Sequence, residues 1–197
     1  LLSMMRVIRL KWHLYLSLLQ HISLLYLELI VEKGIGALDG LPDGIRNDQE
    51  AMAETIENNV RRTIADENPV NPRYYEQMSA LLVELVNLRK QQAIDYQEFL
   101  KRILDLSRRV VKPEQVFYTY PPAMDTQAKR AFYDNFGHDE VLATKIDTTI
   151  RLTKRAEWIG DRFKERELIN ALNEEIKDYD IDVKQVVELA KAQKEYK

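Results

Sequence analysis

The stretch NPVNPRYYEQMSALLVELVNLRKQQAIDYQEFLKRILDL, residues 68–106, decides the fold of this chain. Asn71 is a good helix N-cap, and Pro72 follows at the first helical position, where a missing N–H costs nothing. Apolar side chains then recur every three or four residues, which is the period of one helix face. They are Met78, Leu81, Leu82, Leu85 and Leu88. This pattern predicts a first amphipathic helix.

A second helix is predicted directly after the first. The apolar face ends around residues 89–92, and Asp95 then offers a new N-cap with Glu98 as its capping-box partner. The second apolar stripe consists of Tyr96, Phe99, Leu100, Ile103 and Leu106. A connection this short makes the two helices antiparallel, with their apolar faces together. Since each buried Leu or Phe contributes about 1.5–3 kcal/mol, this hairpin can hold a core, but it contains no catalytic pattern.

The composition favours a soluble helical protein. The 197 residues are 45% apolar and 31% charged, and they include only six Gly and six Pro, which is few for a turn-rich β fold. The absence of Cys excludes disulfides and thiolate chemistry and fits a cytoplasmic protein. A net charge of −3 gives no overall attraction to DNA or to an anionic membrane.

The N-terminal residues 1–31 show the least regular pattern. Basic residues precede an apolar run, as in a signal peptide, but His13, His21 and Glu28 interrupt that run. We therefore expect a buried helix there, with no targeting segment and no membrane span. Because the chain begins at Leu1 rather than Met, we also expect it to be a fragment of a longer protein.

The remaining chain reads as helices separated by short breaks. Residues 34–44 predict a loop and residues 46–64 a helix, while four further helices begin at N-caps. These N-caps are Thr126, Asp139, Asp161 and Asp182. The predicted fold class is all-α, an irregular bundle of about seven to eight helices with one short extended segment near residues 116–120.

We expect one compact domain made of three consecutive parts. Residues 1–111 form an N-terminal helical part that includes the hairpin at 72–111. Residues 112–125 form an extended linker, and residues 126–197 form a C-terminal helical part.

Three patterns that suggest chemistry fail on closer reading. In GIGALDG, the third glycine comes one residue too late for a dinucleotide-binding fingerprint. Acidic residues followed by Lys, at Glu175 and at Asp182, imitate a metal-dependent nuclease, but such a site needs carboxylates held together on Mg²⁺. The three histidines form no metal-binding or nucleophile motif. We therefore predict no catalytic, cofactor-binding or metal-binding residue in this chain.

One stretch, RLTKRAEWIGDRFKER at residues 151–166, is locally basic. Its cations are Arg151, Lys154, Arg155, Arg162, Lys164 and Arg166, set against the acids Glu157, Asp161 and Glu165. The charges fit either solvated helix ends with i,i+4 pairs or contact with phosphates or an acidic partner. Trp158 fits either a packed corner or an exposed anchor residue. These six cations and Trp158 are the candidate partner or DNA contacts.

Several blocks in order resemble the C-terminal helical region of the R subunit of type I restriction–modification enzymes. The blocks are GIGALDGLPDGIRNDQEAMAETIENNVRRTI, NPRYYEQMSALLVELVNLRKQQAIDYQEFLKRI, AKRAFYDNFGHDEVLATKIDTTIRLTKRAEWIGDRFKERELINAL and ELAKAQKEY. The resemblance runs from about Leu29 to the C-terminus. It departs from the expected pattern at Ile159, where an arginine is expected between the Trp and the Gly.

The resemblance implies a parent with an N-terminal nuclease and two RecA-like motor domains that use ATP and Mg²⁺. That parent would be an ATP-dependent type I site-specific deoxyribonuclease that translocates and cleaves foreign DNA. The helical C-terminal region is implied to dock the motor onto the methyltransferase and specificity subunits. We therefore expect a non-catalytic, cytoplasmic assembly module with no cofactor of its own and no membrane partner.

Two other functions are open at this stage. The chain could be a DNA-contacting module that guides duplex DNA into the motor, which requires a local basic patch. It could instead be an independent nuclease, which requires Mg²⁺ and either Glu175 or Asp182.

Overall fold

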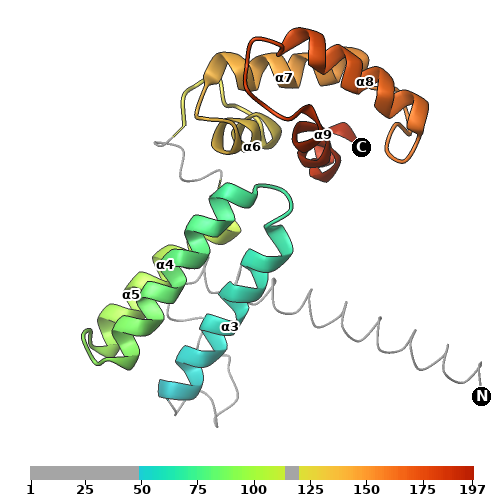
Figure 1. Ribbon diagram of the computed structural model, residues 1–197. Coiled ribbons are helices and arrows are strands. Elements are labelled where there is room, and N and C mark those ends of the chain that lie inside the picture. The colour runs from blue at the N-terminus through green and yellow to red at the C-terminus, as the bar shows by residue number, and fades with distance from the viewer. Residues whose placement is uncertain (1–48, 114–119) are drawn as a thin grey trace, which may run out of the picture. The chain divides into compact units, whose positions relative to one another are not determined.

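The structure, a computed structural model, describes residues 49–113 and 120–197. These residues form seven α-helices and no strand, which confirms the predicted all-α class over the described part of the chain (Figure 1). The helices are α3 (Gln49–Glu67), α4 (Pro72–Lys90), α5 (Tyr96–Val111), α6 (Gln127–Asn135), α7 (Glu140–Thr153), α8 (Arg162–Glu175) and α9 (Val183–Ala192), followed by the 3-10 turn η4 (Lys194–Tyr196). The helix expected within 1–31, the loop at 34–44 and the extended residues 116–119 lie outside the described residues.

The described residues divide into two compact units. The first contains residues 49–66 and 78–113, and the second contains residues 67–77 and 120–197. The first residues of α4 therefore belong to the second unit.

In the first unit, the predicted hairpin is present as α4 and α5. The side chain of Asp95 accepts a hydrogen bond from the backbone N–H of Glu98 at 2.8 Å, as the N-cap prediction requires. The Glu98 carboxylate accepts instead from Arg102, at 2.6 Å, in an i,i+4 pair. The face of α4 is rotated from the predicted one, because Val86 is buried while Leu81 is 40% exposed. The prediction that Leu81 belongs to the core is wrong.

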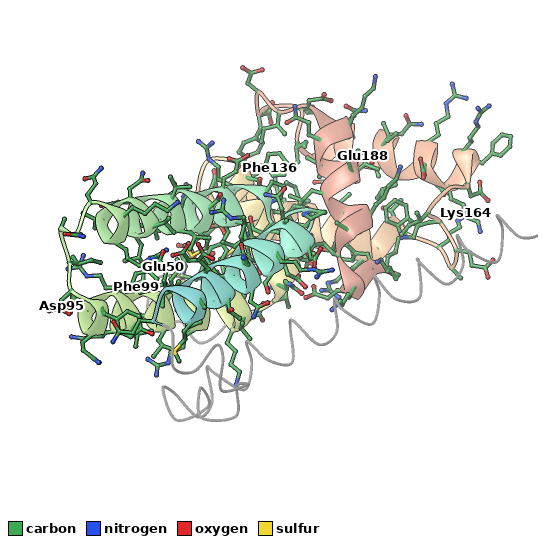
Figure 2. The ribbon with its side chains drawn as sticks, turned by 90° about the horizontal axis from the view of Figure 1, so that it is seen from below. Glu50, Asp95, Phe99, Phe136, Lys164 and Glu188 are labelled. Atoms are coloured by element: carbon green, nitrogen blue, oxygen red, sulfur yellow. The ribbon has the colours of Figure 1, made fainter. Side chains whose placement is uncertain are left out.

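Helix α3 buries Met52, Ile56 and Val60. An ion pair joins α3 to α4, because the guanidinium of Arg89 lies 2.7 Å from Glu57 and also pairs with Glu50. Arg89 Cζ lies 5.2 Å from the centre of the Phe99 ring on α5. Glu50 and Phe99 are labelled in Figure 2.

The prediction that the apolar face ends around residues 89–92 agrees with the end of α4 at Lys90. Arg89 lies at this end of the helix, where two carboxylates and an aromatic ring surround its charge.

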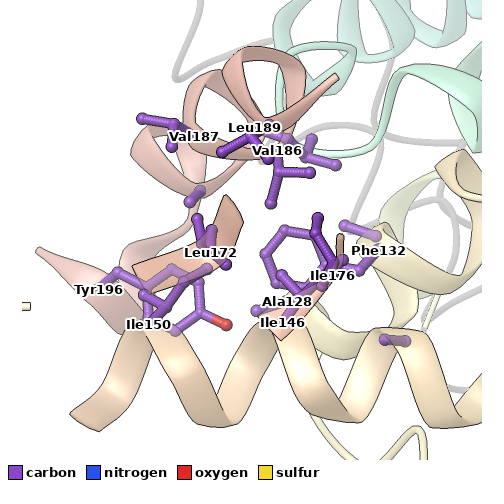
Figure 3. Close-up of a cluster of buried hydrophobic side chains, with 14 of the residues drawn as sticks. Ala128, Phe132, Ile146, Ile150, Leu172, Ile176, Val186, Val187, Leu189 and Tyr196 are labelled. Carbon is purple, nitrogen blue, oxygen red and sulfur yellow. The ribbon is translucent and has the colours of Figure 1, made fainter. Parts of the chain in front are cut away.

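In the second unit, α7 packs against both α6 and α8, and α9 packs against α6 and α8. Their shared core contains Phe132, Ile146, Leu172 and Val186, and Figure 3 shows the ring of Tyr196 among these side chains. On α8, Leu168 is fully buried, whereas the neighbouring Ile169 is only half-buried.

All four predicted N-caps of this unit are present. Thr126 accepts from the N–H of Lys129 at 3.3 Å, and Asp139 accepts from the N–H of Val141 at 2.8 Å. Asp161 and Asp182 likewise accept from the first backbone N–H groups of α8 and α9. Each cap satisfies donors that the helix itself leaves unpaired, which explains where these helices begin.

A polar network fixes residues 67–77 within the second unit. Asn71 caps α4 by accepting from the N–H of Tyr74 at 3.4 Å, and its amide donates to Asp134 at 2.6 Å. The hydroxyl of Tyr120 donates to the same carboxylate at 2.6 Å. Burial raises the pKa of Asp134, although both of these hydrogen bonds oppose the rise. The residue predicted as a local cap therefore also makes a long-range contact.

We predict that Arg89→Ala lowers the free energy of unfolding by about 3 kcal/mol, because it leaves the buried Glu57 carboxylate without its counter-ion. Urea denaturation followed by circular dichroism measures this change. The matched control is Arg102→Ala, which breaks an exposed Arg–Glu pair and should cost less than about 0.5 kcal/mol. Equal losses in the two variants would contradict the structural role assigned to Arg89.

Candidate interaction surface

The locally basic stretch, residues 151–166, folds as a turn between two packed helices, and we call it the basic corner. It comprises the end of α7, the connection at 154–161 and the first turn of α8. The connection contains two residues with positive φ, Glu157 at 53° and Gly160 at 86°. A Cβ on Gly160 would meet no atom within 4 Å, so steric crowding does not require glycine at this position. The positive φ favours glycine instead, because residues with a Cβ rarely adopt it.

Trp158 holds the connection against the core. Its side chain is only 2% exposed, and its indole Nε1 donates a hydrogen bond to the backbone oxygen of Tyr196 at 2.8 Å. Of the two roles that the sequence left open, the structure shows the packed corner. Trp158 is therefore removed from the candidate contact residues, because a buried ring cannot meet a partner.

Arg151 neutralises a buried carboxylate. Its Nε lies 2.9 Å from one oxygen of Asp147 and 3.0 Å from the other, and its guanidinium lies 5.5 Å from the centre of the Tyr196 ring. The Tyr196 hydroxyl donates to Asp147 at 2.6 Å. Burial, together with this hydrogen bond, raises the pKa of Tyr196 well above its ordinary range. The guanidinium of Arg151 is therefore engaged with Asp147 inside the chain, which makes it a weaker candidate for contact with a partner.

The other cations of the basic corner divide into two groups. Arg155 pairs with Glu167 at 2.7 Å, and Lys164, labelled in Figure 2, donates to the backbone oxygen of Ala156 at 2.8 Å. Lys154, Arg162 and Arg166 make no ion pair within the described residues, and the latter two are exposed. The sequence placed all six cations together, but the structure leaves only these three without an internal partner.

Two of the three acids in the basic corner are occupied by the fold. Asp161 caps α8, and the N–H groups of Lys164 and Phe163 lower the pKa of its carboxyl. Glu165 accepts from the N–H of Gly160 at 2.8 Å and lies 3.1 Å from the ammonium of Lys191, and both contacts lower its pKa. Two acids of the corner are therefore engaged within the fold, as are the cations Arg151, Arg155 and Lys164.

Three large apolar side chains are exposed at the basic corner. Phe163 is 84% exposed, Leu152 is 82% exposed and Ile159 is 42% exposed. None of the three is among the contact residues predicted from the sequence. A helical-wheel comparison carries the signal, because Phe163 precedes the buried Leu168 by five residues, which places it about 140° away around α8.

Leu152 also lies at one end of a shallow groove along α7. The groove has a volume of about 480 Å³. It is lined by Ala123, Glu140, Val141, Thr144, Lys145, Thr148, Thr149, Leu152 and Glu175. The exposed side of α7 therefore offers a mixed apolar and polar face to solvent.

The residues considered for a nuclease have other contacts or positions. Asp182 caps α9 by accepting from the N–H of Lys184 at 2.9 Å, and Glu175 is exposed at the last position of α8. Among residues 49–113 and 120–197, no three His, Asp or Glu side chains are grouped as a metal site would need. In the same part of the chain, no helix is both long and apolar enough to span a membrane.

The fold and this surface define a two-unit helical protein with an exposed apolar and basic corner. Comparisons with known protein families, with curated proteins and with solved structures gave no match.

We predict that Tyr196→Phe lowers the free energy of unfolding by about 1–2 kcal/mol near neutral pH, because it deletes a buried hydrogen bond to a charged group. In the wild type, the unfolded chain releases the tyrosine proton near pH 10 while the folded chain retains it. The stability of the wild type therefore falls as the pH rises above about 10, and Tyr196→Phe lacks the part of this loss that Tyr196 causes.

Urea denaturation from neutral pH to above pH 10 measures both effects. The difference between wild type and variant should narrow as the pH rises above the ordinary tyrosine value. A difference that stays constant with pH would contradict the inferred Tyr196–Asp147 interaction.

Proposed function

We propose that this chain is a C-terminal assembly module of a type I restriction enzyme R subunit. It docks the motor onto the methyltransferase and specificity subunits of the restriction complex. The proposal is supported by the ordered sequence blocks that resemble this region and by the all-helical fold. The observation that carries the docking role is the exposure of Phe163, Leu152 and Ile159 at one corner.

An exposed Phe beside Arg residues is typical of a protein interface. Aromatic residues and Arg are enriched at interfaces, and a few such residues contribute most of the binding energy. Burying Phe163 in a partner would recover about 1.5–3 kcal/mol from the hydrophobic effect alone. In the isolated chain this energy is not recovered, because 84% of that side chain is in water.

In this proposal the chemistry belongs to the rest of the R subunit. The parent uses ATP and Mg²⁺ for translocation and cleavage of foreign DNA, and this chain supplies the attachment. No residue of the chain is assigned a catalytic role, and no cofactor is assigned to it.

A second candidate function is contact with duplex DNA, guiding it into the motor. It is favoured by Lys154, Arg162 and Arg166, which have no ion pair within the described residues. It is weakened by the internal contacts of Arg151, Arg155 and Lys164. Three phosphate contacts give only a shallow dependence of affinity on salt, with a slope of about −3 in a log–log plot.

Copurification of the full chain with the cognate methyltransferase–specificity complex, with and without duplex DNA, tests the docking role. We expect binding without DNA, and we expect Phe163→Ser to weaken it at least about tenfold because an interface anchor is lost.

The matched control is Val83→Ser, which removes an apolar side chain that is 45% exposed on α4 and should leave binding unchanged. No binding of the wild-type chain would refute the docking proposal. Binding only in the presence of DNA would favour the DNA-contacting alternative.

A further inference from the structure

We infer that the basic corner docks into an acidic-rimmed apolar pocket on a protein partner, with Phe163 as the inserted side chain. The inference rests on the proposed function in taking the partner to be a subunit of the restriction complex. The docking proposal does not specify the partner surface, and the inference adds that this surface has an apolar pocket rimmed by carboxylates.

The first turn of α8 brings the required groups together. Arg162 and Arg166 are four residues apart and Phe163 and Arg166 are three apart, so these side chains are neighbours on the helix surface. All three are exposed. A partner that receives the ring therefore meets two guanidinium groups at the edge of the same contact, and carboxylates are the groups that guanidinium binds best.

Arg162 and Arg166 make no ion pair within the described residues, because the nearby acids bind other cations: Asp161 pairs with Lys164, and Glu165 pairs with Lys191. The carboxylate of Asp161 accepts from two backbone N–H groups, and that of Glu165 accepts from Gly160 and pairs with Lys191. Of the remaining acids, Glu167 is paired with Arg155. An acidic partner is therefore complementary to what the corner leaves exposed.

The corner is held in one conformation before any partner arrives. The indole of Trp158 is hydrogen-bonded to Tyr196, and the ammonium of Lys164 is bound to the backbone oxygen of Ala156. The N–H of Asp161 donates to the oxygen of Trp158 at 3.2 Å. Binding therefore costs little backbone entropy, and Phe163 is presented from a fixed helix terminus.

A protein partner explains these features better than a nucleic acid does. Duplex DNA gives phosphates to Arg162 and Arg166, but its backbone offers no apolar pocket for Phe163 or Ile159. A protein surface that combines carboxylates with apolar area binds the ring and the cations together.

The test uses the full chain and three synthetic helical peptides as probes. One peptide carries leucines on one face and glutamates on the other, one replaces the glutamates with lysines, and one replaces the leucines with alanines. We expect saturable binding of the Leu/Glu peptide alone, measured by fluorescence anisotropy. Phe163→Ser and the double variant Arg162→Glu/Arg166→Glu should each weaken it at least about tenfold.

Conservative and matched variants separate a contact from a folding defect. Arg162→Lys/Arg166→Lys keeps the charge and should retain most of the binding, while Val83→Ser and Arg102→Glu should leave it unchanged. Circular dichroism should give the same helix content for all variants. Equal binding of the Ala/Glu peptide would overturn the inference, because charge alone would then suffice, and so would the absence of saturable Leu/Glu binding.

Duplex DNA and phosphatidylserine vesicles are tested as competitors in the same assay. One outcome is that DNA or vesicles bind the chain more tightly than the Leu/Glu peptide does, and that this binding disappears in the same variants. In that case the partner is not a protein, and the inference fails. Peptide binding without binding of the methyltransferase–specificity complex would refute the proposed function while supporting the inferred chemistry. The opposite result is a complex that Phe163→Ser does not weaken, together with no binding of the Leu/Glu peptide. It would refute the inference about the partner surface, but the chain would still be a docking module.

Discussion

The structure of the second unit depends on the buried carboxylate of Asp147. A charge in this position is costly unless it is paired, and here Arg151 and the hydroxyl of Tyr196 both bind it. These contacts fix Tyr196 in the core, and the backbone oxygen of Tyr196 in turn accepts from the indole of Trp158. One buried carboxylate thus links the end of α7, the turn into α8 and the last turn of the described chain.

Helix starts could be predicted from the sequence, because a cap is a local interaction. Asp95, Thr126, Asp139 and Asp161 each bind backbone N–H groups within three residues, so the sequence window that contains the cap also contains its partner. The burial of Arg89 could not be predicted in this way. It depends on Glu57, which is 32 residues earlier in the chain and is brought close only when α3 packs on α4.

The candidate surface shows the same division between local and long-range information. The sequence located the basic stretch, and the Arg151–Asp147 pair is an i,i+4 contact within one helix. The sequence could not show that Arg155 pairs with Glu167, twelve residues later, because that contact forms only when the connection between α7 and α8 folds. The two roles of Trp158 were indistinguishable for the same reason. Exposure of Phe163 follows from helix geometry, once the buried positions of α8 are known. The contact that we infer therefore consists of two arginines and a phenylalanine, in place of the six cations and Trp158 predicted from the sequence.

The most direct test of the docking account is amide hydrogen exchange of the full chain, with and without the methyltransferase–specificity complex. The account predicts that the complex slows exchange in residues 151–166, including the connection between α7 and α8, and leaves the α4–α5 hairpin unchanged. Slowed exchange confined to the hairpin, or unchanged exchange throughout the basic corner while the complex is bound, would contradict it.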